Sequence, residues 1–387
     1  MTQDGDNFFE ERKDWSLRKL AIVGGYLAGF SKILGSNASH RCVYFIDGFA
    51  GAGQYKDGSK GSPLLSAELA QRYQSEQKPY RLNCINIEED ADNFQDLTSV
   101  TATYGGLVQN YFGTFSANLN TILHKVGQCP ALFFLDPFGV KGTDWTDIVR
   151  IIHRQAPTDI WIRFDHKTVR RLSGFFDSGS RGADSKIQNL LNLYGINRPD
   201  NLYQLLQGDT PEERVSKALN LYVKKLEEEF VKSRKAGYSA AFPIISLEGE
   251  TKYHLVFAAA HHKAAMLASQ TVYSAERNRA AETQEYQQKK SGQLFLFSPE
   301  PSEDDLFIFV AEQLRSDIMR LCVGRQLNRQ EIFLLLLRDN GKKWFGRFSS
   351  AHLTKALSLL EEGTNPVIQS KNGPNSQEKT VFTFRPA

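Results

Sequence analysis

Residues 42–53 read CVYFIDGFAGAG, and this stretch decides the expected fold. Its first six residues are a short apolar run rich in residues that favour strands, which predicts a buried strand at 42–47. The run ends at Asp47, and a glycine-rich turn from Gly48 to Gly53 follows at once. A turn of this kind after the first parallel strand is where open α/β sheets bind nucleotide-like cofactors. The stretch therefore predicts an α/β sheet with a cofactor site at the carboxyl end of its first strand.

The segments around this stretch alternate between expected strands and helices. Buried strands are predicted at 81–88, 106–112, 131–136 and 159–165, and helices at 15–34, 62–73, 93–103, 116–126 and 143–155. Thr143 is a plausible cap for the last of these helices. The alternation predicts a parallel, Rossmann-like sheet with helices on both faces.

The alternation stops after Arg163. Helices are predicted at 183–195 and 211–234, the second with Thr210 as its N-cap and Pro211 in its first turn. They form an expected helical insertion over about 170–238. Residues 242–260 then predict an antiparallel hairpin with its turn at 248–252. Such a late hairpin belongs to methyltransferase sheets and not to dinucleotide-binding folds.

The last hundred residues predict a second, smaller domain. We expect a methyltransferase-like domain at 1–285, a linker rich in Ser, Gly, Pro and acidic residues at 286–303, and a further domain at 304–387. Three helices (304–317, 328–338 and 350–361) precede two short strands near 367–370 and 380–384, which is the order of a winged helix. Basic and aromatic residues at 342–348 suit nucleic acid, although Trp344 and Phe345 equally suit packing between helices.

Composition excludes several classes of protein. Lys and Arg number 47 against 44 Asp and Glu, so any basic surface must be local. The cysteines, Cys42, Cys84, Cys129 and Cys322, form no CxxC pair, which argues against a metal site and is typical of reduced, buried thiols. No apolar run approaches the ~18 residues of a membrane span, and the N-terminus lacks the apolar core of a signal peptide. We therefore expect a cytoplasmic protein.

Two cofactors compete for the glycine-rich turn. Residues 48–53 fit a GxAxxG pattern that grips a pyrophosphate, whereas residues 47–53 fit a DxFxGxG pattern that suits S-adenosylmethionine (SAM). Glu88 ends the second strand, where it could accept hydrogen bonds from both ribose hydroxyls. It lies farther along the chain than the ~20 residues of the dinucleotide fingerprint. We favour SAM over a dinucleotide, and over a turn that is only structural.

A second motif, Asp136-Pro137-Phe138-Gly139, ends the fourth strand. It is similar to the D-P-P-aromatic motif of amino-methyltransferases, in which the acid or amide oxygen orients the acceptor amine. Phe138 could stack on a flat base. The alternative is an ordinary Asp-Pro turn.

A third group of residues follows the fifth strand. Arg163, Lys167, Arg170 and Arg171 surround Asp165 and His166. These cations could contact phosphates, or they could form a solvated charged turn.

The ordered motifs YFIDGFAGAGQY (44–55), GSP (61–63), IE (87–88) and FLDPFG (134–139) resemble the three-Cys-motif partner protein family over most of residues 10–265. That bacterial family is named after a neighbouring three-cysteine protein. The chain is also distantly similar to the ribosomal RNA adenine methyltransferase J family. The resemblance implies SAM as cofactor, a nucleic-acid substrate and a three-cysteine-motif protein as partner.

The resemblance also implies roles for individual residues. The residues that would hold SAM are Asp47, Gly48, Phe49, Gly51, Gly53, Ser62, Pro63 and Glu88. Those that would act at the acceptor are Asp136, Pro137, Phe138 and, from the first helix, Lys19. The chain departs from the pattern in two places: Phe138-Gly139 replaces Pro-aromatic, and Thr114 stands where an acid is expected after the third strand.

The expected function is thus methyl transfer from SAM to a nitrogen of a nucleic-acid base. One alternative is a non-catalytic partner or sensor protein with a methyltransferase fold, in a bacterial two-gene system. A second alternative is a nicotinamide-dependent oxidoreductase.

Overall fold

The computed structural model of the 387-residue chain describes residues 13–37, 41–174, 183–208, 210–291, 303–339, 343–362 and 366–386. The chain divides into two compact units, one up to Leu267 and one from Ala268. Each unit is described by itself. No helix in the described ranges is both long and apolar enough to cross a membrane.

The first unit is built on a seven-stranded mixed sheet with the strand order β3-β2-β1-β4-β5-β7-β6. Its strands are β1 (Cys42–Asp47), β2 (Arg81–Glu88), β3 (Val108–Phe112), β4 (Ala131–Leu135), β5 (Thr158–Phe164), β6 (Tyr238–Ile245) and β7 (Thr251–Ala259). The first five strands are parallel, and β7 runs antiparallel to both of its neighbours. This order is typical of class I methyltransferases. It confirms the predicted α/β sheet and the late hairpin.

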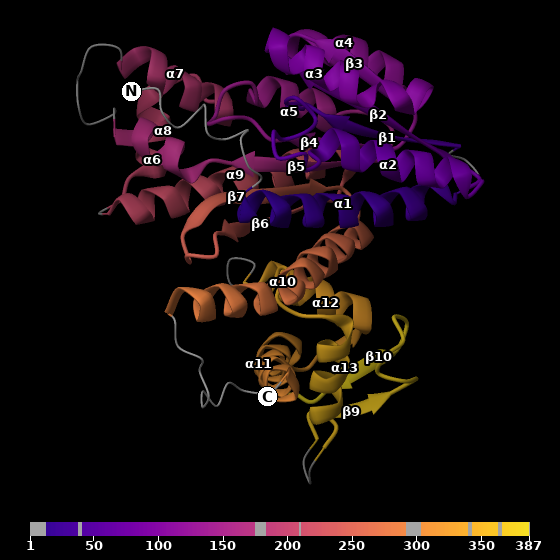
Figure 1. Ribbon diagram of the computed structural model, residues 1–387. Coiled ribbons are helices and arrows are strands. Elements are labelled where there is room, and N and C mark those ends of the chain that lie inside the picture. The colour runs from indigo at the N-terminus through magenta and orange to yellow at the C-terminus, as the bar shows by residue number, and fades with distance from the viewer. Residues whose placement is uncertain are drawn as a thin grey trace. The chain divides into compact units, whose positions relative to one another are not determined.

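One face of the sheet is covered by α1 (Asp14–Gly35) and α2 (Ser62–Ser75) (Figure 1). The helix α3 (Ala91–Thr101) contacts α2. The Tyr26 ring meets the Trp161 and Phe257 rings edge-on, and all three side chains are fully buried. The Tyr26 hydroxyl donates to Asp159 Oδ2 at 2.7 Å. This bond satisfies a polar pair that would otherwise destabilise the core.

The other face packs against α4 (Phe115–Val126), α5 (Trp145–Ile152) and α9 (Pro211–Arg234). Ala131, Phe133 and Leu135 of β4 point into this core. Because side chains alternate along a strand, Leu132 and Phe134 point to the opposite face. Every residue of β4 is therefore buried, as its continuous apolar run predicts.

The segment between β5 and β6 contains more helix than predicted. Its additional helices are α6 (His166–Ser173) and α8 (Pro199–Leu206), beside the expected α7 (Ala183–Tyr194) and α9. The Thr210 side chain caps α9, accepting from the Glu213 amide at 3.2 Å, as predicted. The predicted cap of α5 is wrong: the N-cap is Asp144, not Thr143.

The prediction of four reduced cysteines is also wrong. Cys42 and Cys129 form a disulfide, whereas Cys84 and Cys322 are free and buried. Cys42 begins β1, and Cys129 lies just before β4. Because β1 and β4 are neighbouring parallel strands, the two cysteines meet at the amino edge of the sheet, with 5.9 Å between their Cα atoms.

The second unit contains most of α10 (His262–Ser291) and a small antiparallel sheet. Its other elements are α11 (Glu303–Cys322), β8 (Gln326–Asn328), α12 (Arg329–Arg338), α13 (Ser350–Leu359), β9 (Ile368–Lys371) and β10 (Val381–Phe384). The sheet order is β8-β10-β9, and β8 was not expected. Trp344 and Phe345 are buried, so they serve packing.

The expected linker at 286–303 is corrected at both of its ends. Residues 286–291 are the last residues of α10, and residue 303 begins α11. Residues 292–302 lie outside the described part of the chain.

Two glycines of α1 allow a test of its packing. A Cβ at Gly24 meets nothing within 4 Å, whereas a Cβ at Gly29 comes within 2.7 Å of Leu267 Cδ1. Gly24→Ala should raise the free energy of unfolding by about 1 kcal/mol, because alanine favours the helix. Gly29→Ala should raise the free energy of unfolding by less than this, or lower it, because its Cβ would crowd the Leu267 side chain. Urea denaturation of both variants measures this, and equal stabilisation would show that α1 is packed differently.

The disulfide predicts a thiol count. Titration of the denatured, unreduced protein should find two free thiols, those of Cys84 and Cys322, and four after reduction. Four thiols before reduction would show that Cys42 and Cys129 are not bonded.

Candidate functional site

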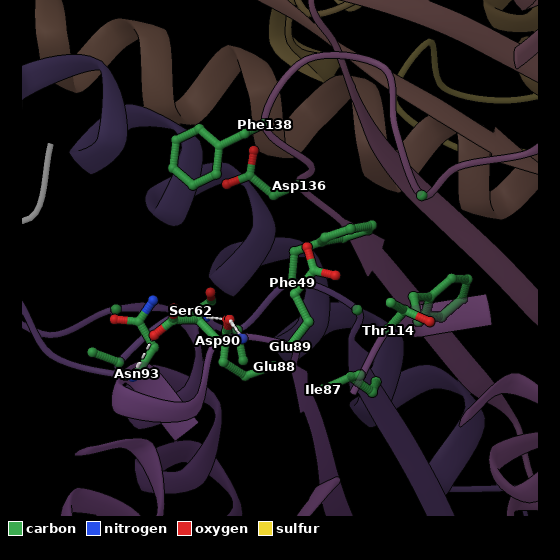
Figure 2. Close-up of a pocket in the computed structure, with 18 of the residues that line it drawn as sticks. Phe49, Ser62, Ile87, Glu88, Glu89, Asp90, Asn93, Thr114, Asp136 and Phe138 are labelled. Atoms are coloured by element: carbon green, nitrogen blue, oxygen red, sulfur yellow. Dashed lines mark hydrogen bonds between the residues drawn. The ribbon is translucent and has the colours of Figure 1, made fainter. Parts of the chain in front are cut away.

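A cavity of about 600 Å³ opens at the carboxyl ends of the central parallel strands. Its wall is formed by the turn after β1, the ends of β2 and β3, the turn after β4, and Lys19 of α1. In Figure 2, Glu88, Asp90 and Ser62 lie on one side of the cavity and Asp136 with Phe138 on another. Carboxyl ends of neighbouring parallel strands meet at one edge of a sheet, and open α/β sheets bind ligands there.

The glycine-rich turn needs its glycines. A Cβ at Gly48 would lie 2.6 Å from Leu135 Cδ2, so any side chain there would displace the buried Leu135 side chain. Gly51 and Gly53 have φ angles of 62° and 78°, a conformation that other residues rarely adopt. The turn is also held by its backbone, because the Gly48 amide donates to the Phe134 carbonyl at 2.9 Å. At Gly48, Gly51 and Gly53 the turn thus presents only main chain to the cavity.

Glu88 joins the end of β2 to this turn. Its Oε2 accepts from the Gly51 amide at 2.7 Å, and its Oε1 accepts from the Asp90 amide at 2.8 Å. Asp90 in turn caps α3, accepting from the amides of Asp92 and Asn93. The Glu88 carboxylate is therefore fixed in orientation at the wall of the cavity.

Asp47 lies beneath the turn and is fully buried. Its Oδ1 accepts from the Phe49 amide at 3.2 Å, and the Ser62 side chain also interacts with this carboxylate. Burial disfavours the charged form and raises the pKa of Asp47 to about 7.

Asp136 is held between two cations. Lys19 Nζ, on a side chain that is almost wholly buried, pairs with Asp136 Oδ2, and Arg163 Nη1 lies 3.6 Å from Asp136 Oδ1. Burial opposes the charge of Lys19, but the attraction of Asp136 outweighs it and raises the pKa of Lys19 above its usual range. Asp136 Oδ1 accepts no hydrogen bond from any described residue.

Phe138 projects from the turn after β4, and 61% of its surface is exposed. The Arg163 guanidinium lies 5.7 Å from the centre of its ring and 4.5 Å from that of Tyr253. An exposed aromatic ring beside a guanidinium offers a flat surface for stacking.

The structure brings most of the predicted site residues to one cavity. Those that line it are Lys19, Gly48, Phe49, Gly51, Gly53, Ser62, Glu88, Asp136 and Phe138. Asp47, Pro63 and Pro137 do not line it: Asp47 lies below the turn, and Pro63 is buried in the first turn of α2. The grouping of the others follows from the parallel order of β1, β2 and β4.

Several lining residues were not predicted, among them Tyr55, Asn93, Phe115, Lys141 and Gly142. Phe115 directly follows Thr114 after the third strand, and this position at the carboxyl edge of the sheet could have predicted that it lines the cavity. The reason for a glycine at position 142 becomes clear only in the structure, because a Cβ there would lie 3.0 Å from the Phe49 ring. Within the described ranges, no cluster of three or more His, Cys, Asp or Glu side chains could hold a metal ion.

Comparison with known proteins gives distant similarities only. No protein-family model and no curated protein matches the chain. An O-methyltransferase from Streptomyces achromogenes, solved in complex with SAM, is 14% identical over 66% of this chain and 92% of its own, with a TM-score of 0.31. An O-methyltransferase from Bacillus cereus, solved with S-adenosylhomocysteine (SAH), is 13% identical over 64% and 92%, with the same TM-score. The methyltransferase-like fold rests on the strand order of the sheet, and no family is assigned.

The raised pKa of Asp47 predicts a pH dependence of stability. The folded chain binds this proton more tightly than the unfolded chain, so the Asp47 contribution is present below pH 4 and is lost as the pH rises towards 7. The loss is at most about 1.4 kcal/mol per pH unit. Denaturation across pH 4–7 should show a smaller fall in stability for Asp47→Asn than for the wild type. The exposed Asp96→Asn should match the wild type, and equal slopes for all three proteins would contradict the assignment.

Proposed function

We propose that the protein is a SAM-dependent methyltransferase that acts on a nitrogen of a nucleic-acid base. One observation supports this most: a single cavity joins the glycine-rich turn and Glu88 to Asp136 and Phe138. The first pair suits a nucleoside cofactor, and the second suits a planar amine acceptor. Its volume falls in the range of about 300–1,000 Å³ that is usual for small-molecule sites.

The residues of the cavity fit SAM. Glu88 would accept from the ribose hydroxyls, and the main chain of the turn would lie along the methionine portion. Asp47, which is buried beneath that turn and does not line the cavity, would support the turn through the Phe49 amide and not contact SAM itself. Bound SAM supplies a methyl group on a sulfonium, which is already a good leaving group.

The acceptor side needs alignment more than covalent help. Asp136 Oδ1 is buried and lies 3.6 Å from Arg163 Nη1, so an acceptor amine would compete with this cation for the carboxylate. A hydrogen bond from the amine to Asp136 would turn the nitrogen lone pair towards the cofactor side of the cavity. Phe138 would stack on the base. Removing a base from a duplex costs a few kcal/mol, so a single-stranded or looped target is favoured.

The contact between Lys19 and Asp136 also favours a second candidate, a non-catalytic partner or sensor protein. Lys19 already engages one oxygen of the acceptor carboxylate. In such a protein the ion pair would be structural, and SAM would be bound without turnover. The winged-helix interpretation of the second unit and the three-cysteine-motif partner fit both candidates.

Cofactor binding tests the first half of the proposal. In isothermal titration calorimetry the wild type should bind SAH, and Glu88→Ala should weaken binding roughly tenfold to 100-fold, because hydrogen bonds to a charged group are lost. Glu76→Ala, on the surface after α2, is the matched control and should bind as the wild type does. Tighter binding of NAD than of SAH would instead establish the oxidoreductase alternative.

Mass spectrometry of hydrolysed nucleic acid tests the second half. Cells with the wild type should contain a modified nucleoside that is lost with Asp136→Ala, while Asp136→Asn, which keeps an acceptor oxygen, should retain part of it. No difference between these cells, together with intact SAH binding, would leave the non-catalytic candidate as the better one.

A further inference from the structure

A second cavity, of about 720 Å³, lies along α6, the helix that directly follows β5. It is lined by His166, Lys167, Arg170, Arg171, Gly174, Glu250 and Thr251. It shares no residue with the cofactor cavity. Three of its seven lining residues, Lys167, Arg170 and Arg171, are cations.

This basic cavity adjoins the acceptor end of the first one. A Cβ at Gly139 would lie 3.5 Å from Thr168 Oγ1, so the turn after β4 packs against α6. Asp165 caps α6 through the Thr168 amide and lies 3.9 Å from Arg163 Nη2. Arg163 also pairs with Asp136, so α6 is linked to the acceptor carboxylate through one arginine.

The charge of the basic cavity is positive at neutral pH. Three cations line it against one carboxylate, and burial lowers the pKa of His166, which keeps that imidazole neutral. The ion pairs of Lys167 with Glu250 and of Arg170 with Glu212 join exposed side chains. Exposed ion pairs contribute little to stability, so these cations can leave their carboxylates and pair with a bound anion at low cost in free energy. Since the whole chain has a net charge of only +3, this is a local concentration of charge.

We propose that the basic cavity binds a backbone phosphate of the nucleic acid whose base reaches Asp136. This inference rests on the proposed function and deepens it, because it assigns the substrate's anchoring site. Arginine pairs with phosphate in a bidentate manner, and such contacts fix the position of a strand without reading its sequence. The exposed Phe138 lines the first cavity and lies beside Arg163, the residue that links Asp136 to α6. Cations beside an aromatic platform suit single-stranded nucleic acid. An acidic peptide would pair with the cations but would have no base to stack on the Phe138 ring.

The test replaces cations that the fold does not need. Val169, Leu172 and Ser173 are the buried residues of α6, whereas Arg170 and Arg171 are exposed. The test variant is Arg170→Gln/Arg171→Gln. The matched control is Lys32→Gln/Lys125→Gln, which removes the same charge from the ends of α1 and α4, at the amino edge of the sheet.

The measurement is fluorescence anisotropy of a labelled 20-nucleotide single-stranded RNA of mixed sequence, repeated at several salt concentrations. The test variant should bind roughly tenfold more weakly than the wild type at low salt. Its slope of log affinity against log salt should be shallower by about 0.7, because one phosphate contact is lost and each such contact on a single strand contributes about 0.7. The control should behave as the wild type does, and a DNA strand of the same sequence should show the same loss.

SAH titration of the same variants keeps the two proposals apart. Unchanged SAH affinity with weakened RNA binding supports the phosphate site. Unchanged RNA binding in the test variant, an equal loss in the control, or equal competition by polyglutamate would overturn it, whatever the cofactor result. Absence of SAH binding in the wild type would instead count against the proposed function.

Discussion

The hydrogen bond from the Gly51 amide to Glu88 Oε2 is the contact on which the cofactor cavity depends. It joins the turn after β1 to the end of β2, two segments whose strands are already in register, with Asp47 opposite Asn86. The other carboxylate oxygen is held by the Asp90 amide at the start of α3. One side chain therefore sets the distance between the two halves of the wall. A ligand with paired hydroxyls would meet a carboxylate whose orientation is fixed in advance, which reduces the entropy lost on binding.

The end of the cavity at Asp136, where we propose that the acceptor binds, is organised by charge instead. Lys19 from α1 and Arg163 from β5 both reach Asp136 at the end of β4. Removing either cation would leave the largely buried Asp136 carboxylate with less compensation, so these contacts tie α1 and β5 to the end of β4. Lys19 also lies 5.7 Å from the centre of the Phe134 ring. These contacts make the acceptor end rigid, which suits a reaction that depends on alignment.

Much of the fold follows from short apolar runs that end in turn residues. The strands at 42–47 and 81–88 are predicted to the residue, because most of their buried positions are apolar and each ends at an acid, Asp47 or Glu88. In α6, by contrast, the sequence HKTVRRLS has few apolar positions, and charged residues hide the helical period. The disulfide could not be predicted, since Cys42 and Cys129 are brought together only by the pairing of β1 with β4. The contact of Lys19 with Asp136 could not be predicted either, because it depends on how α1 crosses the sheet.

A crystal structure of the protein with SAH tests the cofactor site most directly. The ribose should lie beside the Glu88 carboxylate, the homocysteine portion along the turn from Gly48 to Gly53, and the sulfur towards the side of the cavity that Asp136 forms. Density for SAH elsewhere, or side chains filling the space between Glu88 and Asp136, would contradict the assignment of this cavity to SAM.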